Sequence, residues 1–271
     1  MSADLFLHAL RGALTHELDV EWVPETGSTN DDLKRRARRA PLQAPLLLIA
    51  DRQSAGRGTH GRTWRTAALA LIFSLAVPVT KVAASAMPGL LSLAAAMAVA
   101  RGASRATREK ILVKWPNDVW AASGKAGGIL NELVTDASGS GALIIGVGLN
   151  LEVEPGGVTT AGWPVTAIPT RVSMRDPAMR GEFLAGIVDE LLDAFGRLIM
   201  RPDTTEEIIR EWPLYDAFYG RRILWRELDD PARRTEGEDL GIDASGRLLM
   251  RERRGETRAL SGELVSLLNQ D

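Results

Sequence analysis

A segment rich in glycine and arginine, from Gln53 to Trp64, carries the side chains best suited to chemistry in this sequence. It reads Q-S-A-G-R-G-T-H-G-R-T-W and follows an apolar run that is typical of a strand. Glycine allows the backbone to approach a ligand closely, and successive exposed N–H groups bind anions. Arg57 and Arg62 add planar, permanently charged groups that suit phosphate or carboxylate. The segment therefore predicts a loop that closes over an anionic ligand.

This loop has neither of the two common nucleotide-binding patterns. No G-K-[ST] follows its glycines, and their spacing differs from that of a dinucleotide-binding turn. Taken alone, the segment is also compatible with a glycine-rich turn that carries solvated arginines. Further segments of the chain are needed to decide between the two interpretations.

Four other short segments place polar or charged residues beside apolar runs. They are Ser28-Thr29-Asn30, Lys114-Trp115-Pro116-Asn117-Asp118, Gly124 to Leu130, and Gly146-Val147-Gly148-Leu149-Asn150. Together with the G-R-G-x-x-G-R-x-W loop, and in this order, the set closely resembles the biotin protein ligases. The resemblance extends from about Thr26 to the C-terminal segment.

Apolar periodicity predicts the elements that position these segments. We expect strands at 46–50, 69–77, 111–115, 129–134 and 142–147, and helices at 90–101, 180–200 and 204–212, the last ending before Pro213. Residues 29–32 supply caps and acids for the start of another helix, which continues to Ala40. Beyond Gly220, strand-like pieces at 222–226, 235–243, 247–251 and 257–263 predict a small all-β module.

Composition and charge exclude several classes of function. The net charge of −2 gives no global sign of binding to nucleic acid or an anionic membrane. The basic run Lys34, Arg35, Arg36, Arg38 and Arg39 is either an anion-binding patch or, as we prefer, a solvated helix face balanced by acids. The absence of cysteine excludes disulfides, thiol catalysis and cysteine-ligated metal, and it fits a reducing compartment.

No targeting segment is recognisable in the sequence. Residues 1–13 lack the basic start and apolar core of a signal peptide. The longest apolar stretch, 87–100, is too short to cross a bilayer and is better explained as a buried helix. We therefore expect a soluble cytoplasmic protein with no membrane contact.

The resemblance implies an α+β fold and an ATP-dependent ligase. A mixed-sheet catalytic domain of the class II synthetase-like, biotin–lipoate ligase type would occupy residues 1–218, and a small SH3-like β-barrel residues 219–271. The enzyme would be a biotin–[biotin carboxyl carrier protein] ligase with biotin, ATP and Mg²⁺ as its ligands. It would form biotinyl-5′-AMP and transfer biotin to a lysine of its partner, the carrier protein. A homodimer is among the assemblies that the resemblance allows.

The resemblance also assigns site residues, with Lys125 and Arg57 as the catalytic ones. A fixed cation such as Lys125 reduces the repulsion between a carboxylate and the α-phosphate of ATP. The implied biotin-binding residues are Ser28, Thr29, Asn30, Gln53, Gly56, Arg57, Gly58, Thr59, Lys125, Gly127 and Gly128. The implied ATP-binding residues are Arg57, Arg62, Trp64, Lys114, Asn117, Asp118 and Asn150, with Asp118 also as the magnesium ligand. For Trp64, a place in the core at the start of a strand is the alternative.

Three departures from the family pattern affect what we expect. Thr59 stands where many members have arginine, which concerns retention of the adenylate rather than the reaction class. The C-terminal pattern G-E-[VI]-S-L-R lacks its arginine after Gly262-Glu263, so no nucleotide contact is assigned there. Only 27 residues precede Ser28, too few for a winged-helix domain, so we expect a ligase that does not bind DNA.

Two other functions compete with biotin ligation. A lipoate or octanoate ligase or acyltransferase shares the implied fold and a pocket lysine, but the K-W-P-N-D segment and the arginine loop favour biotin. A nucleic-acid-binding regulator is suggested by the basic run alone, and salt-dependent DNA binding would identify it.

Overall fold

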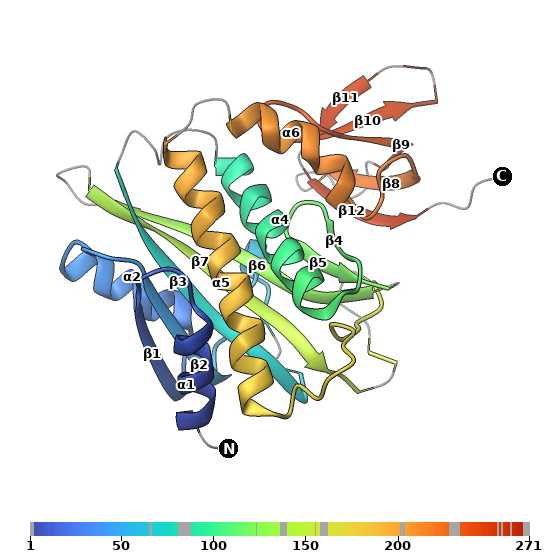
Figure 1. The fold of residues 1–271 in the computed structure, drawn as a ribbon. Helices are drawn as coiled ribbons and strands as arrows, with labels where there is room; N and C mark the ends of the chain where they lie inside the picture. The colour runs from blue at the N-terminus through green and yellow to red at the C-terminus, as the bar shows by residue number, and fades with distance from the viewer. Residues whose placement is uncertain are drawn as a thin grey trace.

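Two β-sheets and a layer of helices make up the protein in the computed structural model (Figure 1). The structure describes residues 3–64, 67–80, 88–122, 124–135, 140–154, 156–157, 162–200, 204–227, 234–253, 255, 257–260 and 262–267. The helices are α1 (Ala3–Ala13), α2 (Thr29–Arg39), the short 3-10 turn η1 (Thr59–Gly61), α4 (Pro88–Thr107), α5 (Pro177–Met200) and α6 (Thr204–Tyr215).

The larger sheet has seven strands in the order β1-β2-β3-β7-β6-β5-β4. These are β1 (Asp19–Thr26), β2 (Leu46–Gln53), β3 (Leu69–Thr80), β4 (Ile111–Lys114), β5 (Asp118–Ala121), β6 (Gly124–Thr135) and β7 (Ser140–Glu152). Strands β1 and β2 run parallel, whereas the other neighbouring pairs are antiparallel. The predicted mixed sheet is therefore confirmed.

The two faces of this sheet bury different clusters of side chains, because successive residues of a strand point to opposite sides. Leu47 and Ile49 of β2 belong to the larger core, which includes α1, α4 and α5. Leu46 and Leu48 belong to a smaller cluster with Leu33 of α2. Helix α2 thus covers one face, and the long helices cover the other.

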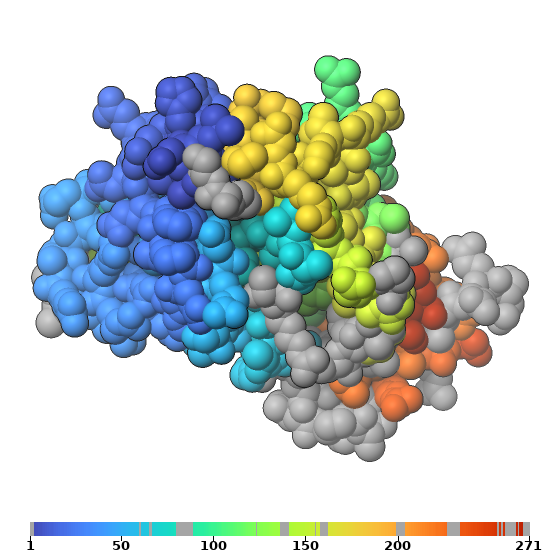
Figure 2. Space-filling model, turned by 90° about the horizontal axis from the view of Figure 1, so that it is seen from below, coloured from blue at the N-terminus to red at the C-terminus, as the bar shows by residue number. Residues whose placement is uncertain are grey.

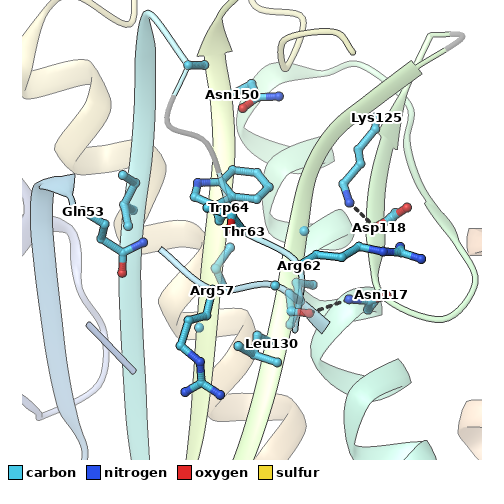
Figure 3. Close-up of a pocket in the computed structure, with 18 of the residues that line it drawn as sticks. Gln53, Arg57, Arg62, Thr63, Trp64, Asn117, Asp118, Lys125, Leu130 and Asn150 are labelled. Carbon is cyan, nitrogen blue, oxygen red and sulfur yellow. Dashed lines mark hydrogen bonds and ion pairs between the residues drawn. The ribbon is translucent and has the colours of Figure 1, made fainter. Parts of the chain in front are cut away.

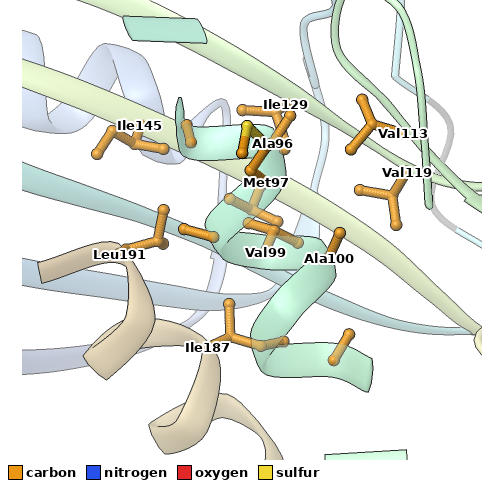
Figure 4. Packing of buried hydrophobic residues seen from close by; sticks show 14 of the residues in the cluster. Ala96, Met97, Val99, Ala100, Val113, Val119, Ile129, Ile145, Ile187 and Leu191 are labelled. Atoms are coloured by element: carbon orange, nitrogen blue, oxygen red, sulfur yellow. The ribbon is translucent and has the colours of Figure 1, made fainter. Parts of the chain in front are cut away.

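Helix α4 packs closely against α5 because its residues are small. A Cβ on Gly102 would lie 2.8 Å from the Cα of Ile187, so only glycine permits this approach. Figure 4 shows Ala96 and Ala100 on α4, with Ile187 of α5 beside this helix and Ile145 of the sheet in the same cluster. The alanine-rich segment predicted as a buried helix is confirmed in this position.

The second sheet is antiparallel, with the order β11-β10-β9-β8-β12. Its strands are β8 (Arg222–Glu227), β9 (Arg234–Ile242), β10 (Leu248–Glu252), β11 (Thr257–Leu260) and β12 (Gly262–Leu267). The sequence predicted this module, although its last piece, 257–263, is divided between two strands. The small sheet lies at the opposite end of the molecule from α1 and β1 (Figures 1 and 2).

Helix α6 corrects one prediction, since it continues through Pro213 to Tyr215 instead of ending before the proline. Proline costs a helix one backbone hydrogen bond, and here that loss falls in the last turn. The turn is stabilised by the buried Trp212, whose carbonyl accepts a hydrogen bond from the Asp216 N–H at 2.9 Å. Helix α1 and strands β1 and β5 were not predicted. No helix within the described ranges is long and apolar enough to cross a membrane.

Two buried carboxyl groups, Asp216 and Asp239, lie where α6 meets the small sheet. Asp216 accepts hydrogen bonds from Trp212 Nε1 at 2.6 Å and from the Phe218 N–H at 3.0 Å. Asp239 accepts one from the Gly241 N–H at 2.8 Å, while its Oδ2 is buried without a partner in the described part of the chain. Burial, followed by the charge of Asp216, raises the pKa of Asp239 to about 8. Burial and the neighbouring Asp216 carboxylate therefore both favour the protonated form of Asp239.

We expect the protein to lose stability as pH rises from about 4 to about 8, and thermal melts at pH 6 and pH 8 to report part of this loss. The pKa of Asp239 is higher in the folded than in the unfolded chain, so its contribution is complete at acidic pH and is lost as pH rises through about 8. The unfolding midpoint should fall by about 5 °C, roughly 2 kcal/mol for a chain of this size. Asp239→Asn keeps the acceptor for Gly241 and cannot ionise, so thermal melts of this variant should depend less on pH. An equal fall in wild type and variant would contradict this account.

Candidate active site

A cavity of about 840 Å³ lies on the face of the large sheet that α2 covers. It is enclosed by the start of α2, the loop after β2, strands β3, β6 and β7, the β4–β5 turn and the segment around Trp163. Nearly all of the site residues predicted from the sequence line it, namely Ser28, Thr29, Asn30, Gln53, Arg57, Gly58, Thr59, Arg62, Trp64, Lys114, Asn117, Asp118, Lys125, Gly128 and Asn150. Segments far apart in the sequence thus meet at one cavity (Figure 3).

One end of the cavity is polar and uncharged. Ser28 caps α2 by accepting a hydrogen bond from the Asp31 N–H. The next residue, Thr29, donates from both its N–H and its hydroxyl to Gln53 Oε1, at 2.8 and 3.1 Å. Gln53 Nε2 makes no hydrogen bond to any residue that the structure describes. This end therefore offers an amide donor to a neutral polar ligand.

Asn30 lines the cavity, but its side chain makes hydrogen bonds within the protein, and its contact with biotin stays a prediction. Its Nδ2 donates to the Leu130 carbonyl at 3.1 Å and to Glu132 Oε2 at 2.9 Å. Its Oδ1 lies 2.6 Å from the hydroxyl of Ser74, which lies equally close to Thr29 Oγ1. Ser74 supports two site residues and was missed in the sequence, where it is the single hydroxyl inside the apolar run of β3.

The opposite end of the cavity holds a carboxylate between two ammonium groups. Asp118 Oδ2 accepts a hydrogen bond from Lys114 Nζ at 3.0 Å, and Oδ1 accepts one from Lys125 Nζ at 2.5 Å (Figure 3 shows the second). Burial raises the pKa of Asp118, but the charges of the two lysines outweigh it and hold the pKa below its ordinary value. With two cations and one anion, this end attracts a further anion.

The geometry of Asp118 disfavours a metal ion at this carboxylate. Both of its oxygens already accept hydrogen bonds from ammonium groups, and a divalent cation there would be repelled by both lysines. No cluster of three His, Cys, Asp or Glu side chains suited to a metal occurs among the residues that the structure describes. The assignment of Asp118 as a magnesium ligand stays a prediction.

Trp64 forms a wall of the cavity and belongs to neither hydrophobic cluster. A Cβ on Gly148 would lie 2.6 Å from the indole, so β7 needs glycine where the ring lies on it. The indole Nε1 is buried and has no acceptor in the described ranges. A buried donor without a partner is costly, which makes Nε1 available to a ligand.

Arg57 is directed away from Lys125 (Figure 3). Its guanidinium lies 2.6 Å from Asp31 Oδ1 and 3.2 Å from Glu132 Oε1, and Lys34 Nζ lies 2.7 Å from each of these carboxylates. Burial raises the pKa of Glu132, but hydrogen bonds from Lys34 and Asn30 and the charges of Lys34 and Arg57 lower it overall. These four charged residues form what we call the α2 ion-pair network.

This network also bears on the basic run of α2. Lys34 pairs with Asp31 and Glu132, Arg35 with Asp32, and Arg36 with Glu21. The acids that balance these cations come from α2 itself, from β1 and from β6. The interpretation as a balanced helix face is supported for these three residues.

Gly56 and Gly127 are the two predicted site residues that do not line the cavity. A Cβ on Gly127 would lie 2.6 Å from the Gly148 carbonyl, and one on Gly56 would lie 2.9 Å from the Trp64 carbonyl. Both glycines therefore permit backbone packing beside the cavity. The sequence also gave no local sign of Trp163 and Val165, which line the cavity from the irregular segment 155–169.

Removing one acid of the α2 ion-pair network should loosen the loop that carries Arg57. In Asp31→Asn, Arg57 loses its ion pair with Asp31 and keeps the one with Glu132. We expect trypsin to cut at Arg57 or Arg62 about twofold to fivefold faster, because a partly exposed ion pair contributes little to stability. Asp32→Asn is the matched control, because it removes the pair with Arg35 in the same turn without affecting Arg57. Mass spectrometry measures the cleavage rates. Equal rates in the two variants would contradict a role of Asp31 in holding the loop.

Comparisons with known proteins agree with the motif set. The model of the Biotin/lipoate A/B protein ligase family matches residues 22–150. The Biotin–[acetyl-CoA-carboxylase] ligase of Paracoccus denitrificans is 32% identical over 236 residues, which are 84% of this chain and 92% of that protein. The ligase of the same name from Mycobacterium tuberculosis is 41% identical over 148 residues, 53% of each chain. This chain thus spans about half the length of the latter relative.

The fold is similar to that of solved biotin protein ligases. The structure of the Aquifex aeolicus enzyme in complex with biotin and ATP has a TM-score of 0.69 at 22% identity, covering 93% of this chain and 99% of that one. This likeness concerns the fold, whereas the Paracoccus relative, matched over nearly its whole length, establishes kinship. The chain belongs to the biotin/lipoate A/B protein ligase family and, within it, to the biotin protein ligases.

Proposed function

We propose that this protein uses ATP to activate biotin as biotinyl-5′-AMP and then transfers biotin to a lysine of a biotin carboxyl carrier protein. The observation that carries the proposal is one cavity with a neutral polar end at Gln53 and a cationic end at Lys125. Biotin has the matching ends, since its ureido ring is neutral and polar and its carboxylate is charged. The name of the Paracoccus relative supports the same reaction.

In the first step, a biotin carboxylate oxygen attacks the α-phosphorus of Mg-ATP. A new P–O bond forms, the bond to the β-phosphate oxygen breaks, and pyrophosphate leaves. The carboxylate is already ionised, so no general base is needed. Lys125 would reduce the repulsion between the two anions and stabilise charge on the phosphoryl oxygens. Among the side chains that the structure describes, only Asp118 contacts the Lys125 ammonium group, so an arriving anion can compete for that group.

In the second step, the acceptor lysine attacks the carbonyl carbon of the mixed anhydride as a neutral amine. An amide bond forms, the bond from carbon to the phosphate oxygen breaks, and AMP leaves with its phosphate charge. The proton of the amine passes to solvent. Lys114, buried beside Asp118, would keep a positive charge near the departing phosphate.

The nucleotide would lie between Trp64 and the β4–β5 turn. Asn117 Nδ2 donates to the Ile129 carbonyl at 2.7 Å and Asn150 Nδ2 to the Thr166 carbonyl at 3.1 Å. No residue within the described ranges donates to the Oδ1 of either amide, so each Oδ1 can accept from a ligand, and Trp64 Nε1 adds a donor. Arg62 would meet the phosphates. Arg57 would reach an anion only by leaving the α2 ion-pair network, so we assign it to the closed, ligand-bound loop.

We also propose a division of the chain into a catalytic domain, residues 1–218, and a small domain, residues 219–271. The five antiparallel strands of the small sheet support an SH3-like barrel as the finer description. The cysteine-free sequence fits a reducing compartment, and we place the reaction in the cytoplasm.

Transfer of biotin to a purified biotin carboxyl carrier domain with Mg-ATP tests the proposal. Lys125→Ala should lower the rate of biotin-dependent pyrophosphate release by about a hundredfold or more while the protein stays folded. Lys110→Ala, at an exposed lysine outside the cavity, is the matched control and should be fully active.

Three results would contradict parts of this account. Activity that survives Lys125→Ala would move the catalytic role to Lys114 or the arginines. Lipoate as the preferred acid would establish the alternative within the family. A wild-type protein that uses neither acid would overturn the ligase assignment.

A further inference from the structure

The segment from Trp163 to Ile168, irregular in sequence, holds the backbone of Lys125. The Lys125 N–H donates to the Pro164 carbonyl at 2.8 Å, and the Thr166 N–H donates to the Lys125 carbonyl at 3.0 Å. Lys125 and Val165 thus form a parallel β-bridge. Both main-chain groups of the proposed catalytic residue are fixed by this segment, which we call the strap.

The strap also holds a second site residue, Asn150. The Ile168 N–H donates to the Asn150 carbonyl at 2.8 Å, and Asn150 Nδ2 donates to the Thr166 carbonyl at 3.1 Å. The side-chain amide is thereby oriented with its Oδ1 free of the strap. The strap therefore connects residues proposed for catalysis and for nucleotide binding.

At the beginning of the strap, Trp163 lies beneath a third site residue. Lys114 Nζ lies 5.5 Å from the centre of the indole, a distance at which the ring attracts a cation. The indole is 8% exposed and packs against both Trp120 and Phe218, with ring centres 5.4 Å away in each case. Its position is thus set by buried aromatic neighbours, and its ring lies within cation–π distance of the Lys114 ammonium group.

The same indole contacts the small sheet. Trp163 Nε1 donates to the Leu264 carbonyl of β12 at 3.3 Å, and the Leu264 side chain is buried. A second connection flanks Lys114, because Trp115 Nε1 donates to the Gly246 carbonyl at 3.0 Å and its ring lies 5.4 Å from that of Trp225. The small sheet therefore contacts two tryptophans next to Lys114, its chain neighbour Trp115 and the ring beside its ammonium group, Trp163.

We propose that Trp163 is a positioning residue through which the C-terminal sheet sets the place of Lys114 for Mg-ATP. The inference rests on the proposed function, since Lys114 is assigned there to the phosphates. Trp163 lies close to the Lys114 ammonium group, donates to the Leu264 carbonyl of the small sheet and lines the cavity. A tryptophan needed only for packing would not combine these three contacts. The small sheet thus supports nucleotide binding although none of its described side chains lines the cavity.

Calorimetric titration of the full-length protein with Mg-ATP and, separately, with biotin tests this inference without depending on turnover. Trp163→Leu removes the aromatic face and the donor, and we expect the Kd of Mg-ATP to rise about tenfold. Trp163→Phe keeps a ring and loses the donor to Leu264, so the Kd should rise about threefold. The Kd of biotin should stay within about twofold in both variants, because the polar end of the cavity is untouched.

Trp22→Phe serves as the matched control, since Trp22 lies on β1 with its Nε1 bonded to Asp51, outside the cavity. Thermal melts give the folded fraction of each variant, and Trp163→Phe carries the test if Trp163→Leu fails to fold. Equal weakening of biotin and Mg-ATP, or unchanged binding of both, would overturn the inference. A wild-type protein that binds Mg-ATP without transferring biotin would overturn the proposed function but leave the test of Trp163 intact. A wild-type protein that does not bind Mg-ATP would overturn both the proposed function and the inference about Trp163.

Discussion

The paired lysines of the cavity depend on one buried carboxylate. Asp118 stands directly across from Lys114 in the β4–β5 hairpin, so a separation of four residues becomes a cross-strand ion pair. Lys125 arrives from the next strand and completes the arrangement. Without Asp118, two ammonium groups would repel each other where water is scarce, and without the lysines the carboxylate would be buried alone, which costs several kcal/mol. The hairpin, the start of β6 and the strap all serve to keep these three groups together.

The shape of the cavity follows from a difference between the two faces of one strand. In β7, Val147 and Leu149 point into the large core, while Gly146 and Gly148 face the cavity. At residues 146–149 the core face therefore carries branched side chains, whereas the cavity face carries only glycine. The missing side chains leave room for the Trp64 ring on Gly148 and for the Asn30 amide, whose Oδ1 lies 2.2 Å from where a Cβ of Gly146 would be. A single period-two pattern thus stabilises the fold and opens the site.

Much of the fold and most of the cavity lining could be predicted, because apolar runs and compact motifs are local signals. The long strands and the helices α4 and α5 are examples. Strand β1 was missed because Glu21, Pro24 and Glu25 obscure its alternation, and β5 because it has four residues. The contacts of Arg57 and Asn30 with Glu132 could not be predicted from the sequence. The glutamate is about a hundred residues from Asn30 in the chain, and no local pattern indicates its partners. Ser74 and Trp163 were missed for the same reason.

The bridge between Lys125 and Val165 uses main-chain groups alone. The backbone of residue 125 is therefore held in the same way whatever side chain it carries. This independence makes the position open to chemical replacement. Because the sequence contains no cysteine, Lys125→Cys would introduce its single thiol, and aminoethylation of that thiol would rebuild an ammonium group on the same backbone. At this position, alkylating reagents of different length and charge would therefore vary the length of the side chain and its charge while the rest of the chain stays the same.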